Sequence, residues 1–136
     1  YSLKSNDDVI LSIQGINSNS GKSAVLMYEY FLCLDLIKNY HQAPPQESYL
    51  VPNFDHWKAH FKNQLSQDEL AESHSLLPPI FIETLNLGAT ISGAPALDRQ
   101  TNRIDFLTIL AKDELNRSLW KRSSYFSESH FEYYYS

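Results

Sequence analysis

One apolar segment constrains the fold of this chain more than any other. Residues 24–34 read AVLMYEYFLCL and would be apolar on nearly every side of a helix. Ser20 precedes the segment as a helix N-cap, and Pro44 and Pro45 forbid its continuation. A helix that is apolar on nearly all sides is usually central and buried. We therefore predict a long buried helix from Ser20 to about His41, which the rest of the chain surrounds.

Capping signals and apolar stripes predict further helices along the chain. Ser66 and Glu69 form a capping-box pattern, and the residue before Pro78 resists helical geometry. Pro79 suits the first turn of a following helix, and Gly88 suits its end. Residues 89–100 are expected to form a loop. The predicted helices cover residues 53–65, 66–77, 80–87 and 102–123.

The N-terminal segment can be interpreted in two ways. Residues 5–8, SNDD, form a capping pattern, and Val9, Ile13 and Ile16 would then share one helical stripe that Gly15 could close. The alternative is a strand, because Val9, Ile10 and Ile13 are β-branched. We predict a helix here and keep the short strand as the alternative.

The last predicted helix carries apolar residues on two sides. Ile104, Leu107, Ala111, Leu115 and Leu119 form one stripe, while Phe106, Ile109 and Trp120 fall roughly opposite, at about 100° per residue. One side can meet the core, and the other needs a second layer or a partner. The expected fold is therefore all-α, a single domain spanning residues 1–136 with about five to six helices and a possible short N-terminal strand.

Composition limits the classes of partner. The chain has 136 residues, which suits one domain, and a formal net charge of -5, which disfavours nucleic acid and anionic membrane surfaces. The nearest approach to a membrane span, residues 24–37, contains Glu29 and Asp35. Cys33 is the single cysteine and is expected to be a small buried residue. The lack of an internal disulfide favours a cytoplasmic location.

Residues 15–23, GINSNSGKS, resemble the P-loop of nucleotide-binding proteins. In that motif backbone N–H groups and a lysine cradle phosphates at a helix start, and the matching residues here are Gly21, Lys22 and Ser23. The segment departs from the pattern because Gly15 stands one residue too far from Gly21 and Ile16 occupies the required glycine position. A phosphate site on these three residues is kept as the alternative function.

No complete catalytic or metal-binding set is evident in the sequence. His56 and His60 lie one helical turn apart and could chelate a metal, but Trp57 stands where the metalloprotease pattern needs glutamate. Both histidines lie outside the apolar stripe of their helix, so a solvated face is the simpler interpretation. We therefore predict no metal, no cofactor and no catalytic residue.

Residues 124–136 form an aromatic C-terminal tail, which is unusual because terminal residues are normally polar. Aromatic side chains are favoured at interfaces, although a tail can also fold over its own core. We predict a protein-interaction module, of the adaptor, accessory-subunit, chaperone or inhibitor type, that contacts another protein or a second copy. The expected contact residues are Phe106, Ile109, Trp120, Tyr125, Phe126, Phe131, Tyr133, Tyr134 and Tyr135.

Overall fold

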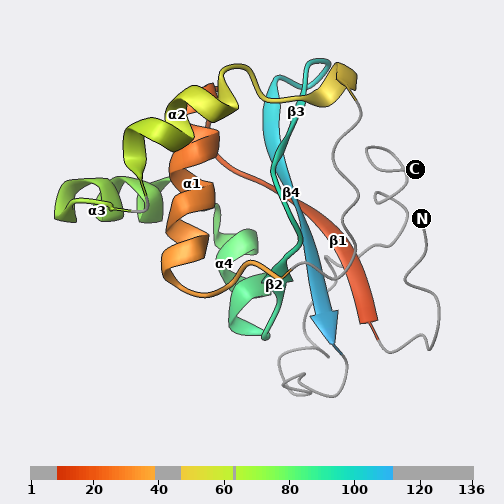
Figure 1. Ribbon diagram of the computed structural model, residues 1–136. Coiled ribbons are helices and arrows are strands. Elements are labelled where there is room, and N and C mark those ends of the chain that lie inside the picture. The colour runs from red at the N-terminus through yellow and green to blue at the C-terminus, as the bar shows by residue number, and fades with distance from the viewer. Residues whose placement is uncertain (1–8, 39–46, 63, 112–136) are drawn as a thin grey trace.

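An antiparallel sheet with helices along one side forms the described part of the chain (Figure 1). The computed structural model describes residues 9–38, 47–62 and 64–111. Its elements in order are β1 (Val9–Gly15), α1 (Gly21–Cys33), the 3₁₀ turn η2 (Glu47–Tyr49), α2 (Phe54–Phe61), α3 (Gln67–Leu76), α4 (Pro79–Asn86), β2 (Thr90–Ile91), β3 (Ala96–Asp98) and β4 (Arg103–Ala111).

The sheet is arranged around β4. Strand β1 pairs with β4 along its whole length, from Val9 opposite Ala111 to Gly15 opposite Asp105. Strands β2 and β3 both pair with the other edge of β4, one after the other along it. The outer side of β2 is met by Ile37, which forms a parallel bridge with Ile91.

The all-α prediction was wrong, because both ends of the described region form strands. Residues 9–15 are β1, the alternative interpretation of the N-terminal segment, and residues 103–111 are β4 in place of the first half of the last predicted helix. The predicted loop 89–100 contains β2 and β3. Asn102, predicted as a helix cap, has a φ of 57° in the turn that leads into β4. Strands alternate their side chains, so residues of each predicted helical stripe lie on opposite faces of the sheet, and both faces of β4 are apolar.

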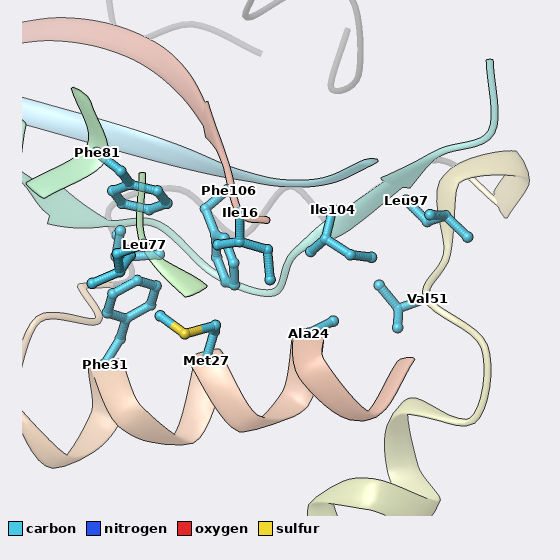
Figure 2. Close-up of a cluster of buried hydrophobic side chains, with 11 residues drawn as sticks. Ile16, Ala24, Met27, Phe31, Val51, Leu77, Phe81, Leu97, Ile104 and Phe106 are labelled. Carbon is cyan, nitrogen blue, oxygen red and sulfur yellow. The ribbon is translucent and has the colours of Figure 1, made fainter. Parts of the chain in front are cut away.

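The main core lies between α1 and one face of β4 (Figure 2). Phe31 of α1 packs edge to face on Phe106 at 5.1 Å between ring centroids, and Phe81 of α4 lies 5.6 Å from Phe31. Ile104 is fully buried in the same cluster. The predicted central helix is therefore confirmed in its role, although α1 ends at Cys33. Cys33 is exposed and not buried as expected.

Local capping signals correctly placed the starts of α1 and α3. Ser20 caps α1 by accepting a hydrogen bond from the N–H of Ser23 at 3.0 Å. At α3, the Ser66 hydroxyl accepts from Glu69 N–H at 3.1 Å, and the Glu69 carboxylate accepts from Ser66 N–H at 2.8 Å. This is the predicted capping box, in which two orphan donors are satisfied reciprocally.

The glycine at the start of α1 gives a test of this packing. A Cβ at Gly21 would collide with the backbone carbonyl oxygen of Pro52. We expect Gly21→Ala to lower the free energy of unfolding by about 1–3 kcal/mol, the usual range for overpacking, although alanine is the better helix former. Urea denaturation measures this, with Glu72→Ala at an exposed position of α3 as the control. A stabilised Gly21→Ala protein would contradict the observed approach of Pro52.

Candidate functional site

The segment resembling a P-loop uses its N–H groups within the fold. Ile16 N–H donates to Ile104 O at 3.0 Å, and Asn17 N–H donates to Leu76 O at 2.9 Å. Ser23 N–H is taken by the Ser20 cap. A phosphate cradle needs these groups to converge on open space, and this segment instead joins β1 to α1 through contacts with β4 and α3.

The Lys22 side chain contacts α2. Its ammonium sits over the ring of Trp57 in α2, 5.7 Å from the centroid. Gly21 is half-buried under the backbone of Pro52. Of the three residues of the alternative phosphate site, Ser23 thus gives its N–H to the Ser20 cap, and Lys22 places its ammonium over Trp57.

The two candidate metal ligands are exposed on α2. The rings of His56 and His60 both contact Trp57, with centroids 5.0 and 5.4 Å from its own. No group of three potential metal ligands occurs among the residues that the structure describes. The arrangement is that of a solvated helix face beside a half-buried aromatic ring.

An ion pair between a buried carboxylate and a partly exposed ammonium joins α1 to α2. The Glu29 side chain is fully buried, and Lys58 Nζ lies 3.0 Å from its Oε1. Within the described ranges, Oε2 of Glu29 has no hydrogen-bond partner. The ammonium also lies 4.8 Å from the centre of the Tyr28 ring. Lys58 therefore neutralises a charge that the interior could not otherwise hold.

Two surface pockets lie beside these helices. One, of about 500 Å³, is lined by Tyr28, Leu32, Cys33 and Lys58. The other, of about 550 Å³, lies where the start of α2 faces the turn between β2 and β3 and is lined by Leu50, Val51, Asn53, Phe54, Asp55, His56, Ala94 and Pro95. In the first pocket the Lys58 ammonium is paired with Glu29, and in the second Asp55 and His56 lie among mostly apolar side chains.

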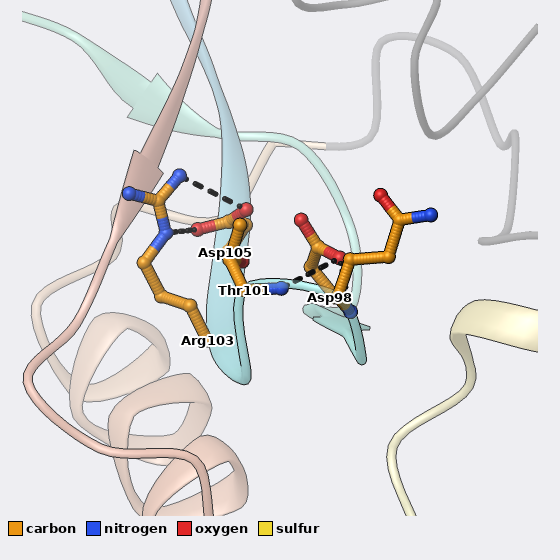
Figure 3. A network of polar contacts seen from close by, with 5 residues as sticks. Asp98, Thr101, Arg103 and Asp105 are labelled. Carbon is orange, nitrogen blue, oxygen red and sulfur yellow. Dashed lines mark hydrogen bonds and ion pairs between the residues drawn. The ribbon is translucent and has the colours of Figure 1, made fainter.

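Two buried carboxylates form a polar network at one end of β4 (Figure 3). Arg103 Nε donates to Asp105 Oδ1 at 2.7 Å, and its second contact to Oδ2 is 3.3 Å. Asp98 accepts from the N–H groups of Gln100 and Thr101 at 2.9 and 3.4 Å. Asp98 thus holds the turn between β3 and β4, and Asp105 holds the Arg103 side chain along the start of β4, which are structural roles.

The outer edge of β1 has no strand beside it within the described ranges. Ile16 N–H and Ser12 O both point toward β4, where they bond Ile104 O and the Thr108 hydroxyl. Backbone groups alternate in direction along an antiparallel pair, so those of Val9, Leu11, Ile13 and Gly15 point away from β4. This row of outward N–H and C=O groups has the geometry that accepts another strand.

The predicted contact residues separate in the structure. Phe106 is fully buried against Phe31 and Phe81 and is therefore part of the core. Ile109 is 1% exposed and stands on the opposite face of β4. The other seven lie outside the described residues: Trp120, Tyr125, Phe126, Phe131, Tyr133, Tyr134 and Tyr135.

Comparison of the chain with protein-family models, curated protein sequences and solved structures found no match. Among the described helices, none is both long and apolar enough to cross a membrane.

The ion pair between Lys58 and Glu29 predicts that substituting Lys58 alone lowers the free energy of unfolding more than substituting both residues. Lys58→Met should lower the free energy of unfolding by about 3 kcal/mol, because it leaves the Glu29 charge buried and unpaired. Adding Glu29→Gln should restore much of that loss. Lys38→Met is a matched control, because its pairing with Asp35 is at the surface and contributes about 0–1 kcal/mol. Equal losses at Lys58 and Lys38 in urea denaturation would contradict a structural role for the pair.

The use of the N–H groups at residues 16, 17 and 23 predicts that MgATP and MgGTP do not stabilise the protein. A true site at about 100 times its dissociation constant would add about 2.7 kcal/mol and would raise the melting temperature visibly. A saturable rise that Lys22→Ala abolishes would establish the phosphate site instead.

Proposed function

We propose that this chain is a protein-interaction module that acts by contact and not by catalysis. Its contact surface is the outer edge of β1, and its partner is an extended protein segment that adds to the sheet as a further strand. In this mode backbone hydrogen bonds supply affinity, while alternate side chains supply specificity.

The observation that carries this proposal is the character of β1. The strand VILSIQG is seven residues long and contains no charge and no proline. Its pairing with β4 runs without a bulge. Edge strands in monomeric proteins are usually protected by charged side chains, proline, bulges or shortness. Strand β1 has none of these, so its outer edge favours pairing with another strand.

The β1 side chains at residues 9, 11 and 13, whose backbone groups point away from β4, also favour an apolar partner. Val9 and Leu11 are half-buried, and Ile13 packs with Leu107 on the sheet face opposite the helices. A partner strand with apolar residues in alternate positions would pack directly beside these side chains. The specificity expected is for uncharged, β-branched or aromatic segments.

Leu11→Lys tests the proposed surface. Random heptapeptides are selected for binding to the full chain, and the bound peptides are located by amide hydrogen exchange. At chain concentrations low enough to keep single copies, we expect selected peptides to protect the N–H groups of Leu11 and Ile13. Leu11→Lys should weaken their binding about tenfold or more, because losing one apolar contact costs roughly 1.5–3 kcal/mol.

Glu72→Lys on α3 is the control, because it adds the same side chain at an exposed position away from β1. It should bind the selected peptides as the unmodified chain does. Peptides that protect amides elsewhere, or that bind Leu11→Lys unchanged, would overturn the assignment of β1.

A further inference from the structure

We propose that the partner at the β1 edge is a second copy of this chain, paired antiparallel with β1 about a two-fold axis at Ser12. This inference rests on the proposed function, because it uses the same edge and names its occupant. A two-fold axis is the commonest symmetry of homodimers and requires a surface that complements itself.

The register follows from which backbone groups point outward. Outward residues pair with outward residues, so Leu11 faces Ile13 of the second copy, and Val9 faces Gly15 of the second copy. In this register all the outward residues of β1 gain hydrogen-bonding partners, and the two strands overlap along their full length. A shift of two residues would leave outward groups at both ends unpaired.

The same strand is complementary to itself in chemistry. It carries no charge, so an antiparallel copy brings no like charges together. Leu11 and Ile13 meet on the sheet face opposite the helices, where Ile13 already packs with Leu107 and with the half-buried Tyr49. Pairing would therefore continue one apolar surface across the axis.

The other edge of the sheet is less suited to a second copy. The described pairing of β2 covers two residues, and its outer side already bonds residues 36 and 38 through Ile91. Strand β3 has three residues. At seven residues, β1 offers the longest edge open in the described ranges, and an uncharged edge of that length without proline also has the features of an aggregating segment. A closed dimer removes that hazard for both copies at once.

A disulfide at the axis tests the register directly. Ser12 would face Ser12 of the second copy in a non-hydrogen-bonded pair, with Cα atoms about 4.5 Å apart, which a disulfide can bridge. We expect Ser12→Cys, in a Cys33→Ser background, to form a covalent dimer under mild oxidation. Ile10→Cys in that background is the control, because Ile10 faces Gln14 of the second copy and should not cross-link with itself.

Light scattering on the full chain gives the second measurement. We expect twice the 15.7 kDa of a single chain, falling to the single-chain mass in Leu11→Lys while Glu72→Lys stays dimeric.

A single-chain mass at high concentration, without a Ser12→Cys cross-link, would overturn the dimer. If heptapeptides then still protected Leu11 and Ile13, strand addition would stand with a different partner. Protection of these amides in a single-chain species without peptide would mean that another segment of the same chain occupies the edge.

Discussion

The pairing of β4 on both of its edges is the constraint on which the described structure depends. One edge receives β1 along seven residues, and the other receives β2 and β3 in turn. The residues from Ile104 to Leu110 are buried throughout, so both faces of the strand are withdrawn from water. A strand buried on both faces must be central, and helices α1 and α4 can then pack on the face that carries Phe106.

The helices between residues 20 and 87 were predictable because their signals are local. The Ser20 cap, the Ser66–Glu69 box and Pro79 each act within one turn of a helix, and each was found at the expected position. The strands were predicted wrongly because the contacts that form them join residues far apart in the sequence. The buried hydrogen bond between Ser12 and Thr108 joins residues 96 apart in sequence, and the local sequence around either residue does not indicate this contact. In an apolar run such as 104–110, helical and strand periodicities both fit, and tertiary pairing decides between them.

The candidate sites also differ in whether local sequence or distant contacts determine them. The spacing of Gly15 and Gly21 argued against a P-loop from sequence, and the structure adds that several N–H groups of the segment bond β4, α3 and the Ser20 cap. The polarity of Glu29 within an apolar helix was a visible signal, but its partner Lys58 comes from a helix whose placement depends on packing. Phe106 and Ile109 were grouped because a helical wheel places them together, whereas a strand sends them to opposite faces.

At Val9 and Leu11, strand β1 is more apolar than the fold requires. Val9 and Leu11 are half-buried, and a lysine at either place could lay its stem along the sheet while its ammonium reached water. Such a lysine would protect the edge at little cost to the pairing with β4, because the backbone groups that bond β4 belong to residues 10, 12 and 14. The core needs Ile10 and Ile13, but it does not need an uncharged edge. An apolar side chain where a charged one would fit supports the proposed pairing of this edge with another strand, for which its outward N–H and C=O groups are arranged.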